Sequence, residues 1–188
     1  MWGIRAGIGG IAHLQFLERG FVGLSDPGMG DLRKIPPDRQ SFYAAYRRLR
    51  PGETAIGIRG IGGKFFRFTH EIDIGDLVVY PSLNEGRIFV GRVAGQYTYS
   101  NQQIENLPHQ RSVKWICNFP KSRLSKTAQR ELGAARTFFE VKSHSVEISS
   151  LVRQLISTNS QGRGSWGSGM TIDLLEPVAL LEAIASVH

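Results

Sequence analysis

Short runs of apolar and β-branched residues, separated by glycine-rich or polar turns, recur along this sequence. Runs of four to eight such residues are typical of strands in a compact, β-rich domain. The expected strands are residues 2–6, 21–24, 77–81, 87–94, 96–99, 111–117 and 136–142. Between two of these runs, the tripeptide Asn84-Glu85-Gly86 favours a hairpin turn.

Apolar residues at helical spacing predict a smaller number of helices. The expected helices span about 11–20, 38–49, 126–132 and 145–156. Asp38 is a suitable N-cap for the second of them, and Pro51-Gly52 would end it. Many short strands with few helices predict an α+β fold, namely a small curved β-barrel with flanking helices.

The chain is expected to form one main domain. With 188 residues, 41% of them hydrophobic, it can bury one good core. This domain is assigned to residues 1–156. Serine, glycine and asparagine dominate residues 157–170, which predicts a flexible linker, and residues 171–188 are apolar enough for a C-terminal helix.

Positive charge is the clearest functional signal in the composition. The net charge is +7, and the segment from Arg87 to Arg153 holds eleven Lys and Arg against four acids. A concentrated basic region attracts phosphate backbones and other polyanions. The single cysteine, Cys117, excludes an intrachain disulfide, and no apolar run approaches the length of a membrane span. We therefore expect a cytoplasmic protein that binds an anionic partner and no membrane.

No complete catalytic or metal-binding motif is present, so neither an enzyme nor a bound cofactor is expected. Glu140-Val141-Lys142 matches half of the metal site of one large nuclease superfamily, but the chain has no aspartate between Asp76 and Asp173 to supply the other half. The five histidines form no i, i+4 pair. A metal-dependent nuclease that uses Glu140 and Lys142 stays open as an alternative.

Aromatic and basic residues are interleaved through the middle of the chain. They are Phe65, Phe66, Arg67, Phe68, Tyr80, Arg87, Phe89, Tyr97, Tyr99, His109, Arg111, Lys114 and Trp115. Aromatic rings stack on nucleic-acid bases, and Arg and Lys bind phosphates. The same rings can instead fill a barrel core, so the pattern is informative only together with the charge.

Several stretches, in order, resemble the N-terminal modified-DNA-reading domain of Mrr-type restriction endonucleases. The matching stretches are WGIRAG (2–7), GFVGL and GMGDL (within 20–32), FFRFTHEIDIGDLVVYPS (65–82), IFVGRVAGQYTYS (88–100), HQRSVKWI (109–116) and FPKSRLSKTAQRELGAARTFFEVK (119–142). This domain belongs with the PUA-like folds, near the EVE and YTH modules. The resemblance implies a PUA-like barrel that accepts a modified base flipped out of the DNA helix.

The resemblance also implies two sets of site residues. The base pocket would be formed by Trp2, Arg5, Leu24, Ser25, Asp26, Tyr80, Pro81 and Ser82. The nucleic-acid backbone would contact Arg87, Arg92, His109, Arg111, Lys114, Lys121 and Arg123. Where related sequences commonly have Gly-Trp, this chain has Ser25-Asp26, so it lacks one wall of an aromatic cage. Asp26 would instead accept hydrogen bonds from an exocyclic amine, or it serves only as a turn former.

The implied partner is DNA that contains a modified base, recognised on behalf of a restriction or defence system. In such enzymes a nuclease domain follows the linker, so a separate nuclease subunit or domain is a further implied partner. Two other readings stay open: an RNA-binding reader, since PUA-like and YTH-like folds also serve RNA, and a protein-interaction domain with a basic face.

Overall fold

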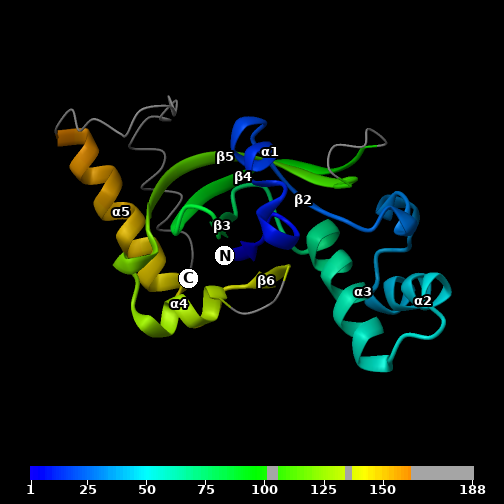
Figure 1. The fold of residues 1–188 in the computed structure, drawn as a ribbon. Coiled ribbons are helices and arrows are strands. Elements are labelled where there is room, and N and C mark those ends of the chain that lie inside the picture. Colours follow the sequence, from blue (N-terminus) through cyan, green and yellow to red (C-terminus); the bar gives the residue numbers. More distant parts are fainter. Residues whose placement is uncertain (101–105, 134–136, 162–188) are drawn as a thin grey trace.

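A computed structural model describes residues 1–100, 106–133 and 137–161 of the protein, and within these residues the strands form one curled sheet (Figure 1). The strands are β1 (Trp2–Ile4), β2 (Phe21–Leu24), β3 (Leu77–Pro81), β4 (Arg87–Tyr99), β5 (His109–Pro120) and β6 (Phe138–Glu140). Their order across the sheet is β2-β5-β4-β3-β1-β6. Neighbouring strands are antiparallel, except that β1 runs parallel to β3.

The curl of the sheet has its origin in the two long central strands. The pairing of β4 with β5 shifts register twice, between Val90 and Gly91 and between Val93 and Tyr97. Such bulges increase the local twist of a strand pair. Gly91 permits the first shift, because a Cβ atom there would lie 2.5 Å from Cγ1 of Val113. The result is a half-barrel rather than a flat sheet.

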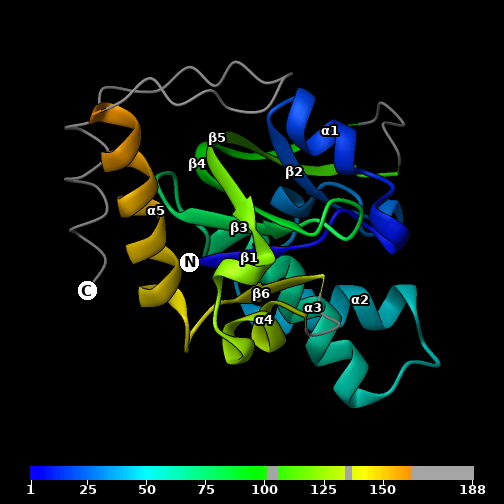
Figure 2. The ribbon, with the colours of Figure 1, turned by 60° about the vertical axis from the view of Figure 1, so that its left-hand side comes forward.

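Helices cover both faces of this half-barrel (Figures 1 and 2). They are α1 (His13–Glu18), α2 (Arg39–Leu49), α3 (Ala55–His70), α4 (Lys126–Gly133) and α5 (Ser145–Gln161), with short 3-10 turns η1 (Ile8–Gly10), η2 (Pro27–Met29), η3 (Leu32–Lys34) and η4 (Lys121–Arg123). None of the described helices is long and apolar enough to cross a membrane.

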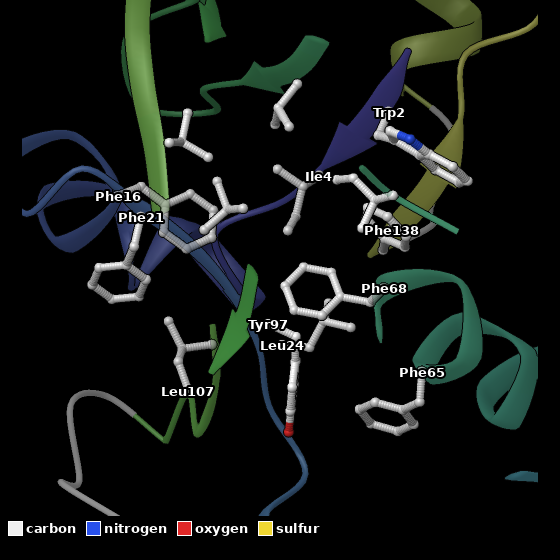
Figure 3. Close-up of a cluster of buried hydrophobic side chains, with 14 of the residues drawn as sticks. Trp2, Ile4, Phe16, Phe21, Leu24, Phe65, Phe68, Tyr97, Leu107 and Phe138 are labelled. Atoms are coloured by element: carbon white, nitrogen blue, oxygen red, sulfur yellow. The ribbon is translucent and has the colours of Figure 1, made fainter. Parts of the chain in front are cut away.

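The two faces bury separate hydrophobic clusters, as the alternation along β3 requires. Val78 and Tyr80 belong to the cluster that includes residues of α1, α2 and α3, whereas Leu77 and Val79 belong to the cluster under α4 and α5. Figure 3 shows the first cluster, in which Phe16, Leu24 and Phe68 converge from α1, β2 and α3. Every one of these rings and side chains is fully buried.

The predicted α+β class, with a curved sheet and flanking helices, is confirmed. The runs at 21–24 and 77–81 form β2 and β3 with the predicted bounds. The two runs within 87–99 are one continuous strand, β4. The helix expected over 145–156 continues as α5 to Gln161, so the first five residues of the expected linker are helical. The rest of that linker and the expected C-terminal helix lie outside the described residues.

One long helix, α3, is not among the elements that the sequence predicts. Its segment contains four glycines, each of which costs about 1 kcal/mol relative to alanine in a helix interior. Packing explains one of them: a Cβ atom at Gly62 would lie 2.9 Å from Cδ1 of Tyr43 and 3.1 Å from the carbonyl oxygen of Phe42. Gly62 therefore lets α2 and α3 approach closely, and tertiary contact outweighs the poor helix propensity.

Candidate nucleic-acid interface

The loop that follows β2 holds a strained aspartate. Leu24 ends the strand fully buried, Ser25 is exposed, and Asp26 has φ 98°, a left-handed conformation that side chains other than glycine rarely adopt. The carbonyl oxygen of Asp26 accepts hydrogen bonds from Met29 N–H at 3.2 Å and from Nε2 of His109 at 3.1 Å. These two bonds hold the strained backbone in place. Strained backbone conformations occur preferentially at functional sites.

His109 links this loop to the core through a fixed chain of hydrogen bonds. Because its Nε2 must donate to the Asp26 carbonyl, its Nδ1 accepts from the hydroxyl of Tyr97 at 2.8 Å. The Tyr97 oxygen in turn accepts from Leu32 N–H at 3.3 Å. Burial lowers the pKa of His109, which keeps the imidazole neutral as this chain requires.

A half-buried lysine from α3 faces the same loop. The ammonium of Lys64 lies 4.7 Å from the ring centroid of Phe65 and makes no hydrogen bond or ion pair with any residue that the structure describes. Burial lowers the pKa of Lys64, while the negative charge of Asp26 acts in the opposite direction. A desolvated cation without a hydrogen-bond acceptor is poised to bind one from a ligand.

The C-terminal part of α2 lies against the same loop. Tyr46 is 4% exposed, and burial, together with the charge of Asp26, raises the pKa of its phenol. Leu49 packs so closely on the loop that a Cβ atom at Gly28 would lie 3.0 Å from its Cδ1. We refer to Asp26, Tyr46, Lys64, Tyr97 and His109 together as the β2-loop site.

The neutral state of His109 predicts a pH dependence of stability. Its folded-state pKa lies below the unfolded value of about 6.5, so the unfolded chain binds the proton first. The free energy of unfolding should therefore fall as the pH drops from about 6.5 through the folded-state pKa. His70, whose pKa is also lowered by burial, adds to the same trend. Urea titrations at about pH 7.5 and pH 5.5 should show a smaller loss for His109→Gln than for the unchanged protein.

Two of the predicted pocket residues, Trp2 and Arg5, lie at the β1–β6 edge of the sheet. Trp2 is 7% exposed, its Nε1 donates to Oδ2 of Asp76 at 2.8 Å, and its ring stacks on Phe138 with the centroids 5.0 Å apart. The guanidinium of Arg5 donates to the carbonyl oxygen of Leu132 at 3.1 Å. Trp2 is thus already stacked within the protein (Figure 3).

The other predicted pocket residues, in β3 and just after it, form a separate buried group. Pro81 is buried, and Tyr80 is 2% exposed with its hydroxyl 2.9 Å from Nδ1 of His13. Nε2 of His13 lies 2.7 Å from Oε1 of Glu85, and the Ser82 hydroxyl accepts from Glu85 N–H at 3.3 Å. Burial raises the pKa of Tyr80, which retains its proton. These hydrogen bonds connect α1 to the turn between β3 and β4.

Two residues expected to face the nucleic-acid backbone are instead buried. His109 is 0% and Arg111 is 1% exposed, so the expectation that they lie on an exposed surface is wrong. Both alternate inward on β5, as the two-residue period of a strand dictates for positions 109 and 111. His109 contacts the Asp26 loop, and Arg111 donates to backbone carbonyls at the end of α3.

The remaining backbone candidates are less enclosed. Arg87 is half-buried, and its Nε donates to Oδ1 of Asn118 at 2.6 Å. Arg92 is half-buried as well and donates to the carbonyl oxygen of Gly75. Lys114 and Lys121 are half-buried, and Arg123 is exposed.

The nuclease half-motif gains no partner in the described part of the chain. Glu140 ends β6, and its Oε2 lies 3.2 Å from Nζ of Lys142, with both side chains exposed. Among the described residues, no group of three histidine, cysteine, aspartate or glutamate side chains is arranged to hold a metal ion. Here the two residues form a surface ion pair.

Three of the five residues of the β2-loop site were singled out from the sequence, Asp26 by the resemblance and Tyr97 and His109 by the aromatic pattern. Tyr46 and Lys64 were not recognised as site residues. Lys64 was overlooked because the glycine-rich segment around it does not have the apolar spacing typical of a helix. The run of basic residues without acids across α2 and α3 is the signal that could have found it.

Comparisons with known proteins place the chain in a family without assigning an activity. The family described as "Domain of unknown function (DUF8426)" matches residues 15–142, which include β2 to β6 and the whole β2-loop site. No curated protein and no solved structure matches the chain. Because the family match spans more than half of its residues, this protein belongs to the DUF8426 family of domains.

Proposed function

We propose that this protein is a DNA-recognition module that binds a modified base, flipped out of the duplex, at the β2-loop site. The observation that carries the proposal is that the ammonium of Lys64, near enough to Asp26 for the carboxylate to act on its pKa, has no hydrogen-bond or ion-pair partner among the described residues. The carboxylate of Asp26 belongs to a strained, partly exposed residue, and the ammonium of Lys64 makes no hydrogen bond to any described residue. An acceptor and a donor thus act on one another electrostatically without an ion pair between them, next to a hydrogen-bonded scaffold.

This pair complements the edges of cytosine and adenine. Both bases carry an exocyclic amine, which can donate to Asp26, next to a ring nitrogen, which can accept from Lys64. Thymine offers a carbonyl in place of that amine, and so does guanine at C6, and the carboxylate of Asp26 would repel this carbonyl. Guanine also has an amine at C2 next to N3, so the pair discriminates chiefly against thymine. The partial burial of Lys64 strengthens such hydrogen bonds, because less water competes for the ammonium.

Base flipping requires a source of binding energy for the extruded nucleotide. Unstacking costs a few kcal/mol, and stacking on one aromatic ring returns about 1–3 kcal/mol. The two aromatic residues of the base pocket that the resemblance implies, Trp2 and Tyr80, are 7% and 2% exposed and occupied by their own contacts. Tyr99 is half-buried, and its ring centroid lies 5.6 Å from that of His109, so Tyr99 is the better stacking candidate.

The test is a fluorescence-anisotropy titration at fixed salt. It compares duplexes that differ by one 5-methylcytosine, 5-hydroxymethylcytosine or N6-methyladenine with the unmodified duplex and with single-stranded RNA. We expect a preference of about tenfold or more for one modified duplex, an effect of the size that a well-formed hydrogen-bonded base contact provides. In Lys64→Met the preference should drop below about twofold, because the donor is lost while the apolar stem remains.

Lys34→Met is the matched control, since Lys34 is an exposed lysine that forms no ion pair with a described residue. Its removal should lower the affinity for all duplexes slightly and equally. Equal, steeply salt-dependent binding to every duplex would sink the base-recognition proposal. Tighter binding to the RNA than to any duplex would favour an RNA-binding module instead.

A further inference from the structure

The helices α2 and α3 and the turn between them form a hairpin that is a second strongly basic segment, beside the one from Arg87 to Arg153. Residues 39–70 contain seven Arg and Lys and one acid, Glu53, and neither helix contains an acidic residue. In both views the hairpin lies at the side of the molecule opposite α5 (Figures 1 and 2). We call residues 39–70 the basic hairpin.

The charges at the tip of the basic hairpin are not compensated by neighbouring acids. The tip carries four exposed arginines, Arg47, Arg48, Arg50 and Arg59. None of them forms an ion pair with a residue that the structure describes, whereas Arg39, at the other end of α2, pairs with Glu71. Concentrated like charges repel one another and destabilise the compact state. An anionic partner would relieve this repulsion.

The helix dipoles explain only part of this arrangement. Arg47 and Arg48 lie in the last turn of α2, where the negative end of the helix dipole favours cations. Arg59 is the fifth residue of α3 and lies near the positive end of that helix, where a cation gains nothing. Glu53 accepts a hydrogen bond from Thr54 N–H at 2.8 Å at the start of α3, and it forms no ion pair with a described arginine. The helix dipole and Glu53 therefore leave the charge of Arg59 without a favourable interaction among the described residues.

We propose that the basic hairpin binds the phosphate backbone of duplex DNA and so positions the duplex against the β2-loop site. This inference rests on the proposed function. Arg59 and Lys64 are five residues apart in α3, about 7.5 Å along the helix axis, and Asp26 acts on the charge of Lys64. The hairpin thus carries cationic side chains both at its tip and near the candidate base site. It takes the place of His109 and Arg111, which are buried.

The experiment compares two triple variants that each reduce the net charge from +7 to +4. The hairpin variant is Arg47→Gln/Arg48→Gln/Arg59→Gln. The control variant removes exposed charges from α4 and α5, as Lys126→Gln/Arg130→Gln/Arg153→Gln. Affinities for a modified and an unmodified duplex are measured by fluorescence anisotropy at several salt concentrations. Thermal unfolding of each variant checks that both remain folded.

We expect the hairpin variant to lose about tenfold or more in affinity for both duplexes at about 0.1 M salt. The slope of log affinity against log salt should become shallower by about 2–3, because each lost phosphate contact contributes about 0.9. The ratio between modified and unmodified duplex should stay unchanged, and the control variant should change both affinities by less than about threefold. Equal losses in the two variants, or unchanged binding in the hairpin variant, would overturn the inference.

The two proposals fail in different ways. If the unchanged protein binds every duplex equally and only the hairpin variant loses affinity, the hairpin binds DNA and base recognition at the β2-loop site is wrong. If the hairpin variant keeps both full affinity and a preference for one modified duplex, base recognition is supported. In that case residues outside the basic hairpin bind the DNA backbone, and the hairpin proposal is wrong.

Discussion

Replacement of Arg111 by methionine is expected to lower the free energy of unfolding by about 3 kcal/mol. The guanidinium is 1% exposed and donates to the carbonyl oxygens of Phe68 at 2.8 Å, Thr69 at 2.8 Å and Gly95 at 3.3 Å. It therefore joins the C-terminal end of α3 to β4. Methionine fills a similar volume but leaves these buried carbonyls without a donor, and each unsatisfied group costs about 1–3 kcal/mol.

Urea denaturation measures this loss, with Arg153→Met as the matched control. Arg153 is exposed on α5 and forms no ion pair with a described residue, so its replacement should stay within about 0.5 kcal/mol. The same pair separates a structural from a DNA-binding role for Arg111. A backbone-contacting Arg111 would give weaker DNA binding with unchanged stability, and this result would contradict the structural role.

The elements that were predicted well have strong local signals. In the strand Leu77–Pro81, the first four residues alternate between the two hydrophobic clusters, and turns bound the run, which fixes both its type and its limits. Asp38 caps α2 as predicted, through a hydrogen bond from Ser41 N–H at 2.9 Å. In each case the information lies within a few residues of the element itself.

The elements that were missed depend on contacts distant in the sequence. The glycines of α3 read locally as a loop, and their helical state relies on the close approach of α2 at Gly62. The burial of Arg111 likewise depends on carbonyls about forty residues away, at Phe68 and Thr69. An arginine in a run of basic and aromatic residues therefore suggests a surface contact, although the fold uses this one internally.

The one pocket residue of the resemblance that contributes to the β2-loop site is Asp26, which differs from the residue that related sequences commonly have there. Trp2 and Tyr80 conform to the resemblance, and both are buried in the core. Asp26 departs from it and has the strained backbone of the β2-loop site. Lys64 completes the site from α3, and the same helix carries Arg59 towards the tip of the basic hairpin. A single helix thus connects the proposed base contact with the proposed backbone contact.

Replacement of Asp26 by glycine is expected to stabilise the protein while it abolishes the preference for a modified base. A residue other than glycine held at φ 98° costs on the order of 1–3 kcal/mol, and glycine removes this strain. The greater freedom of glycine in the unfolded chain offsets part of the gain. We expect a net increase of about 1 kcal/mol, seen as a rise in Tm of about 2–4 °C.

The stability gain and the functional loss have separate causes, which Asp26→Asn distinguishes. Asparagine tolerates the left-handed conformation about as well as aspartate and keeps the shape of the side chain, but it replaces one carboxylate oxygen by an amide. Its Tm should stay close to that of the unchanged protein, while the preference for the modified duplex falls as in Asp26→Gly. If Asp26→Gly gained stability and kept the preference, Asp26 would be a turn residue only. Loss of preference in both variants, with a stability gain in the glycine variant alone, would mean that the fold tolerates strain at Asp26 because the carboxylate binds the base.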